Sequence, residues 1–153
     1  DAAAFHSRWL RSRGDDYDWN TRTRLEAASL VPATAYIKAQ QARTLVQREM
    51  LALLDRFDVL VAPSSNAPAQ SIESATGRPG GNYQGLRDMA RRRLTSPASL
   101  AGLPALSVPC GFSKSGLPIG LQIIGKPYGE ATLFRAGHAY ESATGWHAMH
   151  PAL

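Results

Sequence analysis

The chain has 153 residues, a length that suits one domain, and its 44% hydrophobic and 19% charged residues are the composition of a folded globular protein. No apolar run approaches the roughly 18 residues that a membrane span requires, so we expect no membrane partner. The net charge of +5 comes from basic residues that stand beside acids in separate segments, without a recognisable nucleic-acid-binding module, so we expect no nucleic-acid partner.

Two short helices are predicted at the start of the chain. Apolar residues at helical spacing predict a helix over 1–13. An aspartate-rich loop follows, and a second helix is predicted over 21–30. Asn20 or Thr21 is its expected N-cap, because short polar side chains accept hydrogen bonds from the first backbone N–H groups of a helix.

A long helix and a strand come next. The helix opens at Pro32 and ends at Asp58, and its apolar side chains recur every three to four residues. The sequence VLVA at 59–62 is a short continuous apolar run, which is typical of a strand buried on both faces of a parallel sheet. Segment 64–86 is polar and rich in Gly, Pro and Ser, and it is predicted to be a long loop of the kind that often carries function.

The remainder predicts a helical turn, two strands and a final helix. Ser96 is the expected N-cap of a short helix that ends at Gly102. Two apolar strands then flank the turn SKSG, and an amphipathic helix is predicted over 130–143. This order of helices and strands indicates an α/β fold.

Three residues are candidates for a nucleophile. Cys110 has no histidine near it in sequence, and a reactive thiol needs a neighbour that stabilises the thiolate, so a buried packing role is favoured. A single cysteine also makes no internal disulfide, which points to the cytoplasm. Ser64 and Ser65 lack the G-x-S-x-G elbow of a serine nucleophile, so a polar loop with local hydroxyl-to-backbone hydrogen bonds is favoured.

No metal or cofactor is expected. His147 and His150 form an H-x-x-H pair, but a zinc site needs three or four ligands and the other histidines are far away in the sequence. No Gly-rich phosphate loop of the P-loop or dinucleotide type is present. The residues alone therefore predict an α/β domain with a polar loop beside a strand end, and no catalytic set.

Four motifs follow one another in the second half of the chain. They are T-x-P-x-x-L-A-G-L-P-A at 95–105, S-V-P-C-G at 107–111, G-L-P-I-G-L-Q-I-I-G at 116–125 and E-A-T-L-F-R…Y-E at 130–141. Together they resemble the C-terminal block of the amidase signature family, and the upstream sequences FDVLVAPSSNAPA and YIKAQQARTLVQREM also resemble segments of that family. The resemblance implies that residues 1–153 form a single partial domain, the C-terminal portion of the amidase-signature fold with a mixed β-sheet flanked by helices.

The resemblance also implies a chemistry that this chain does not contain. Family members act on amide bonds with a Ser–cis-Ser–Lys group: the lysine is the base, the bridging serine relays the proton, and the second serine attacks the carbonyl. The Gly/Ser-rich loop that bears those serines is absent from the sequence, and Ser64 and Ser65 align with a different, proline-containing segment. The chain begins with Asp1 rather than Met, and we expect a C-terminal fragment of a hydrolase that is inactive alone, with the triad upstream.

Some residues are expected to line the pocket for a small-molecule amide in the full-length enzyme. By resemblance these are Ser64, Ser65, Asn66, Ala67, Thr95, Ser96 and Pro97. Amidotransferase A subunits of the tRNA-dependent pathway hold their amino-acid substrate with an arginine, which matches Arg24, and with an aspartate, whose place Arg92 takes here. An arginine there would repel an ammonium group, which favours a general amidase over the amidotransferase.

Two further expectations remain open. The chain is alternatively a non-catalytic interaction subunit or a pseudo-enzyme fragment, with its basic N-terminal helices as the contact surface. In either case the strands at 58–62, 105–109 and 119–124 would lack neighbours, and open sheet edges promote pairing with other chains. We therefore expect the chain to self-associate.

Overall fold

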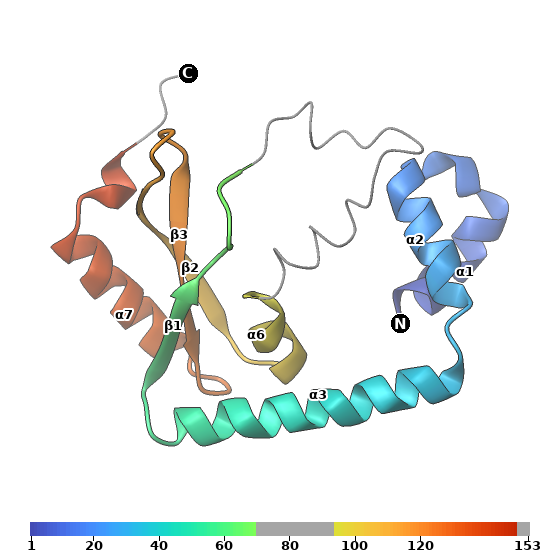
Figure 1. The fold of residues 1–153 in the computed structure, drawn as a ribbon, viewed down its shortest axis with the longest axis horizontal. Coiled ribbons are helices and arrows are strands. Elements are labelled where there is room, and N and C mark those ends of the chain that lie inside the picture. Colours follow the sequence, from blue (N-terminus) through green and yellow to red (C-terminus); the bar gives the residue numbers. More distant parts are fainter. Residues whose placement is uncertain (70–93, 150–153) are drawn as a thin grey trace. The chain divides into compact units, whose positions relative to one another are not determined.

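The computed structural model describes residues 1–69 and 94–149 (Figure 1). Contacts between Cα atoms divide the chain into two compact units, Asp1–Ala42 and Arg43–Leu153. Most of the loop expected at 64–86, together with Arg92 and His150, lies outside the described residues. Within the described part, no helix combines the length and the apolar character that a bilayer crossing demands.

The first unit is helical. Its elements are α1 (Ala2–Ser12), a 3-10 turn (Gly14–Asp16), α2 (Trp19–Ser29) and the start of α3 (Ala33–Leu54). The two predicted short helices are therefore confirmed, but the predicted cap of the second is wrong. The side chain of Asp18 accepts hydrogen bonds from the backbone N–H groups of Asn20 at 3.0 Å and Thr21 at 3.4 Å, so α2 starts earlier than expected.

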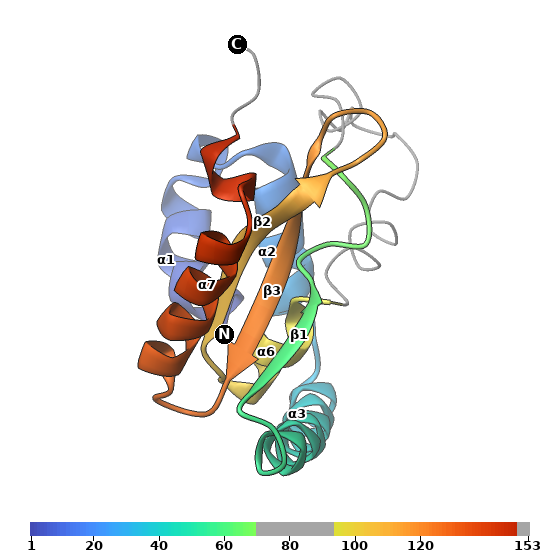
Figure 2. The same ribbon diagram turned by 90° about the vertical axis from the view of Figure 1, so that its left-hand side faces the viewer.

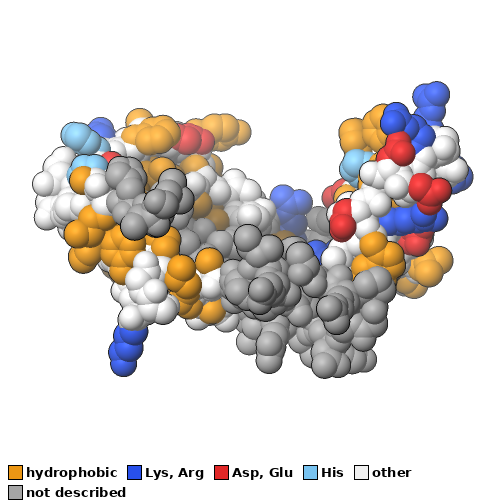
Figure 3. Space-filling model, turned by 90° about the horizontal axis from the view of Figure 1, so that it is seen from above, with side chains coloured by type: hydrophobic (Ala, Val, Ile, Leu, Met, Phe, Trp, Pro, Cys, Tyr) orange, Lys and Arg blue, Asp and Glu red, His pale blue; other side chains and the backbone are white. Residues whose placement is uncertain are grey.

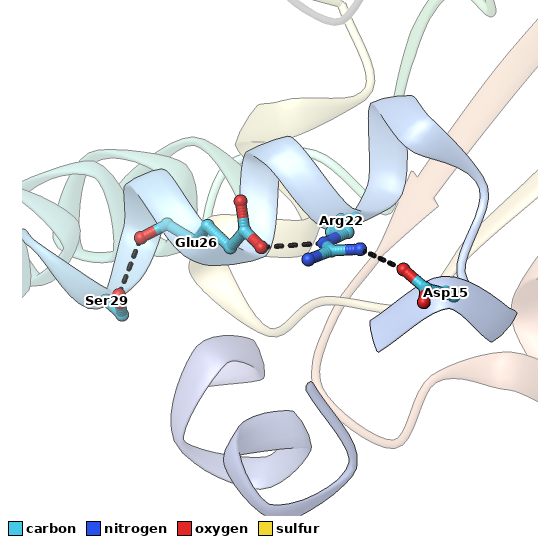
Figure 4. Close-up of polar contacts among 4 residues, drawn as sticks. All are labelled: Asp15, Arg22, Glu26 and Ser29. Carbon is cyan, nitrogen blue, oxygen red and sulfur yellow. Dashed lines mark hydrogen bonds and ion pairs between the residues drawn. The ribbon is translucent and has the colours of Figure 1, made fainter. Parts of the chain in front are cut away.

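Charged side chains of both signs cover this unit. Arg22 donates from Nη1 to Asp15 at 2.6 Å and from Nε to Glu26 at 2.8 Å (Figure 4). The hydrogen bonds to Glu26 and Asp15 raise the pKa of Arg22 above its ordinary value. Basic and acidic side chains are interspersed on the right-hand part of Figure 3, so the arginines of this unit form a mixed, solvated surface rather than a uniform positive patch.

The second unit is built on a three-stranded sheet. Its strands are β1 (Val59–Pro63), β2 (Ala105–Phe112) and β3 (Pro118–Gly125), in the order β1-β3-β2. Both pairings are antiparallel, with Val59 opposite Gly125 and Ser107 opposite Gln122. The strand type inferred from VLVA therefore differs from the one observed, because β1 pairs antiparallel and Val61 is 61% exposed.

Helices cover both faces of this sheet (Figure 2). Alternate side chains of a strand point to opposite faces. On one face Val108 and Ile123 pack against Leu133 of α7 (Glu130–Ala143). The other face packs against α6 (Ser96–Ala101) and the end of α3, in a cluster of Leu54, Ala98, Ala101, Leu103 and Ile124. The expected α/β class is confirmed, with helices and an antiparallel sheet.

Polar contacts join the two helices that share a face. The Nε of Arg43 donates to the carbonyl of Leu100 at 2.7 Å, and the Nε2 of Gln47 donates to the carbonyl of Ala101 at 2.9 Å. Both acceptors are carbonyls of the last turn of α6, which have no partner within the helix. Side chains of α3 thus satisfy the C-terminal end of α6, and Gly102, with φ of 69°, ends that helix as predicted.

Helix α7 approaches the sheet closely because one of its residues has no side chain. A Cβ placed on buried Gly137 would lie 2.5 Å from Cδ2 of Leu106 and 3.6 Å from Cγ1 of Val108. The first separation is shorter than a carbon–carbon contact allows. The glycine therefore sets the distance between α7 and β2.

Candidate functional site

Two serine hydroxyls meet at the end of β1. The backbone N–H of Ser64 donates to the carbonyl of Gly120 at 2.8 Å, which continues the ladder between β1 and β3. The Oγ of Ser64 lies 2.6 Å from the Oγ of Ser107 on β2, across the central strand. This contact passes over Gly120, where a Cβ would lie 2.8 Å from Oγ of Ser64 and 3.0 Å from Oγ of Ser107. The glycine is thus what allows the outer strands to share a hydrogen bond.

Adding a methyl group at position 120 should separate these hydroxyls. We expect Ser64→Ala to lower the free energy of unfolding by about 0.5–1.5 kcal/mol, the usual net contribution of one hydrogen bond. Gly120→Ala should cost more, because it removes the same hydrogen bond and also crowds both serines. Urea denaturation of the two variants beside the wild-type chain measures this order, and a Gly120→Ala variant as stable as the wild type would show that the close approach is not required.

The loop after Ser64 is held by local hydrogen bonds. The Oγ of Ser65 donates to the carbonyl of Ala67 at 2.8 Å and accepts from its backbone N–H at 3.3 Å. This is the hydroxyl-to-backbone pattern that the sequence favours for a polar loop. The loop lines a pocket together with the start of β3, formed by Ser65, Asn66, Ala67, Pro68, Pro118 and Ile119. Ser65 and Asn66 therefore form part of a concave surface, as a binding role requires.

The second group of candidates lies at the start of α6. Thr95, Ser96 and Pro97 are half-buried, and Thr95 is the N-cap of the helix. The prediction of Ser96 as the cap is wrong, because Ser96 is already helical, and the side chain of Thr95 makes no capping hydrogen bond. Helix α6 packs against Ile124 of β3. Gly120 precedes Ile124 on the same strand by an even number of residues, so its position belongs to the same face of the sheet. Helix α6 therefore lies on the face that carries Gly120.

One predicted site residue belongs to the other unit. Arg24 lies on α2, within the unit Asp1–Ala42, and its side chain is exposed. Its assignment to the same pocket as Ser64 and Thr95 stays a prediction. Arg92, on which the comparison with amidotransferases depends, lies outside the described residues.

Two residues that the sequence prediction did not select also belong to the site. Ser107 pairs with Ser64, and Gln122 lies directly opposite Ser107 in the sheet. Gln122 is only 7% exposed, and its Oε1 has no hydrogen-bond partner among residues 1–69 and 94–149. Each of the two is a polar residue between apolar neighbours in a strand, in the sequences LSV and LQI. This pattern is the sequence signal that could have found them. Such a residue stands out only when the strand's two faces are considered separately.

The remaining candidates are Cys110 and the histidine pair. Cys110 is half-buried on β2 rather than fully buried, beside the irregular pairing between Pro109 and Gly111. Among the residues 1–69 and 94–149, no group of three or more His, Cys, Asp or Glu side chains is placed to hold a metal ion. His147 lies in a short 3-10 turn (Trp146–Ala148) and is exposed.

Comparison with known proteins defines the class of this fold. The crystal structure of an amidase superposes with a TM-score of 0.79 at 26% identity, over 93% of this chain and 32% of that one. A 6-aminohexanoate cyclic dimer hydrolase complexed with substrate gives a TM-score of 0.69 at 27% identity, over 90% of this chain and 30% of the other. The fold of the chain thus matches about a third of the amidase structure and of the hydrolase structure.

Sequence comparison places the chain in a family. The profile of the family described as Amidase matches residues 6–134. An amidase of Pseudomonas putida is 45% identical over 154 aligned residues, which are 100% of this chain and 33% of that protein. A glutamyl-tRNA(Gln) amidotransferase A subunit from Geobacillus stearothermophilus is 46% identical over 77% of this chain and 23% of its own length. The chain belongs to the amidase family, as its motifs predict, and spans about a third or less of these relatives.

Proposed function

We propose that this chain forms part of the substrate-binding region of a hydrolase that cleaves carboxylic amide C–N bonds. The observation that carries the proposal is the family match over residues 6–134. The hydroxyl pair of Ser64 and Ser107 and the adjoining pocket at Ser65 and Asn66 support it, because they offer polar groups around a concave apolar surface. The proposed substrate is a small-molecule amide.

The catalytic group is proposed to lie in another part of a longer protein. A serine becomes a nucleophile only with an adjacent base and fixed donors for the oxyanion. The partner of Ser64 is a second hydroxyl, and the partner of Ser65 is its own loop backbone. Neither arrangement includes a base. A Ser–cis-Ser–Lys group, with the serines on the Gly/Ser-rich loop of the family and the lysine further upstream, would supply the base and the nucleophile.

An amide-hydrolysis assay tests the proposal. We expect the purified 153-residue chain to release no ammonia from simple amides and no acid from simple esters above the buffer rate. Turnover that disappears in Ser64→Ala, Ser65→Ala or Cys110→Ala would contradict this and place the nucleophile here. The reading frame upstream of Asp1 provides a second test. A Gly/Ser-rich signature there supports the hydrolase, and a start codon immediately before Asp1 supports a non-catalytic subunit.

A tRNA-dependent amidotransferase A subunit is the second candidate. The observation in its favour is the 46% identity to the protein of Geobacillus stearothermophilus. The substitution against it is Arg92, at a place where a carboxylate would bind an ammonium group. The two candidates differ in the fate of the acyl group, because a hydrolase transfers it to water and needs no tRNA. An activity assay of the full-length protein with and without charged tRNA therefore separates them. Activity that depends on charged tRNA supports the amidotransferase, and activity without tRNA supports the hydrolase.

A second copy of the chain is the partner that we propose for the isolated protein. Among the described residues, β1 pairs on one side alone, and Val61 and Phe57 beside it are exposed. Exposed edge strands pair with other chains, and a lysine on the edge prevents this. No nucleic-acid or membrane partner is proposed, and the cytoplasmic location stays a prediction.

Sedimentation velocity checks the self-association. We expect the wild-type chain to show a concentration-dependent shift to larger species, and Val61→Lys to shift that equilibrium toward monomer by about tenfold or more, as burying a lysine charge at an interface requires. Ala139→Lys, on the exposed side of α7, is the matched control and should leave the equilibrium unchanged. A wild-type chain that stays monomeric at all concentrations contradicts the proposal.

A further inference from the structure

Aromatic side chains gather on one side of α1. His6 and Trp9 are three residues apart and therefore project from the same side of the helix, with their ring centroids 5.9 Å apart. Tyr17, which follows the 3-10 turn, meets the ring of His6 edge-to-face at 5.7 Å, and its hydroxyl lies 2.9 Å from Nδ1 of His6. This partly buried hydrogen bond holds the segment after α1 against the helix.

These three rings and one ion pair line a hollow of about 290 Å³ that is open to solvent. The other two lining residues are Arg13 and Asp16. The volume is close to the lower end of the range of about 300–1,000 Å³ for small-molecule pockets, which have mostly apolar walls and a few polar groups. All five lining residues belong to the unit Asp1–Ala42, so the hollow shares none with the pocket at Ser65 and Asn66.

The rings of the hollow have surface left for a ligand. Trp9 is 42% exposed, although a side chain of its size gains much from burial. The planes of His6 and Tyr17 are inclined by 86°, and such an edge-to-face pair does not cover both faces of either ring. A further aromatic ring can therefore pack against these side chains in the offset or edge-to-face arrangements that aromatic groups prefer.

Arg13 supplies hydrogen-bond donors in the wall of the hollow. Its Nε donates to Oδ2 of Asp16 at 2.6 Å. A guanidinium has five N–H groups, and the four on Nη1 and Nη2 of Arg13 have no acceptor among the residues that the structure describes. Two N–H groups of a planar guanidinium match the two oxygens of a carboxylate. Asp16 thus holds the guanidinium in place without using the donors that a carboxylate would take.

We propose that this hollow is a binding site for an aromatic carboxylate. The ring of the ligand packs against Trp9 and Tyr17, and its carboxylate accepts hydrogen bonds from the Nη atoms of Arg13. An aliphatic acid lacks the ring contacts, and an aromatic amine brings a cation toward the guanidinium, which repels it. The inference goes beyond the proposed function, because such a ligand has no amide bond to cleave and the hollow lies in the helical unit rather than on the sheet.

Nuclear magnetic resonance of the 153-residue chain tests the site, with benzoate as the probe. Three analogues each change one feature: cyclohexanecarboxylate lacks the aromatic ring, benzyl alcohol lacks the charge, and benzylamine reverses it. We expect benzoate to shift the indole N–H signal of Trp9. Its affinity should exceed that of cyclohexanecarboxylate about threefold or more, the contribution of an aromatic pair, and that of the other two about tenfold or more, the effect of a charge-assisted hydrogen bond. Benzoate that binds no better than benzyl alcohol, or that leaves the signal of Trp9 unchanged, would overturn the inference.

Two pairs of variants test the residues. Arg13→Gln should weaken benzoate binding about tenfold, whereas Arg11→Gln, at an exposed arginine outside the hollow, should leave it unchanged. Trp9→Leu should weaken binding about threefold or more, and Trp19→Leu, on α2 and also outside the hollow, should not. Since Arg13 is exposed, its variant should show the circular dichroism of the wild type and give the binding result independently of folding. Equal losses in the two arginine variants would mean a general attraction to positive charge and would overturn the inference.

Asp16→Asn decides between an anion and a cation as the ligand. Asparagine keeps an acceptor oxygen for Nε of Arg13 and removes the negative charge. We expect the affinity for benzoate to stay equal or to rise, because a repulsive charge beside the carboxylate is lost. A tenfold loss of benzoate affinity would contradict the inference. Benzylamine that binds the wild-type chain more tightly than benzoate, and loses that affinity in Asp16→Asn, would overturn it in favour of a cation held by Asp16 and the rings.

Discussion

Replacing Leu54 by alanine is expected to lower the free energy of unfolding of the second unit by about 2–5 kcal/mol. Leu54 is 1% exposed, and its side chain joins α3 to α6 and to Ile124 of the central strand. Removing it leaves a cavity at the point where three elements meet, and the surrounding backbone has little freedom to fill it. Urea denaturation followed by circular dichroism measures the loss.

The preceding residue provides the matched control for this change. Leu53 lies on the same helix and is 42% exposed, so Leu53→Ala should change the free energy of unfolding by less than about 1 kcal/mol. Similar losses for the two variants would mean that α3 is not packed against the sheet as described. The same result would remove the basis for placing α6 on the sheet face that carries Gly120.

The second large effect is expected at Gly137. Valine there would place methyl groups where Leu106 already lies, because even a Cβ would lie 2.5 Å from its Cδ2. We expect Gly137→Val to lower the free energy of unfolding by about 1–3 kcal/mol through overpacking. The exposed Ala139 on the same helix is the control for the lower helix propensity of valine, and Ala139→Val should cost only a few tenths of a kcal/mol.

A double substitution shows whether crowding is the cause. Leu106→Ala makes room for the new side chain, so Gly137→Val and Leu106→Ala together should be less destabilising than the sum of the two single changes. Urea denaturation of the four chains gives the coupling energy. If the two single losses of unfolding free energy simply add up to the loss in the double variant, the contact between α7 and β2 is not the one described.

Local sequence signals predicted the helices well. The spacing of apolar residues placed α1 and α7 within a residue or two of their observed ends, because a helical face depends on neighbours three or four positions away. The caps were predicted less well: Asp18, not Asn20 or Thr21, caps α2, and Thr95 precedes α6 where Ser96 was expected. Adjacent polar residues are chemically equivalent as caps, so only the path of the chain decides between them.

The sheet and the site depend on contacts that are distant in sequence. The run VLVA is apolar enough for either sheet type, and its antiparallel pairing depends on β3, which lies far along the chain. Ser64 was selected as a pocket residue, but its partner Ser107 was not, because the bond between them needs three strands in register and a glycine at position 120. The family resemblance named the right region without giving these contacts.

The strand order has a consequence for how this unit assembles. The central strand β3 follows β2 directly through a tight turn, in which the backbone N–H of Ser113 donates to the carbonyl of Leu117 at 2.8 Å. The outer strand β1 reaches the same central strand across a far longer stretch of chain, so its docking bears the greater loop-closure entropy. Since Ser64 lies at the end of β1, the hydroxyl pair exists only when this least local pairing of the sheet has formed.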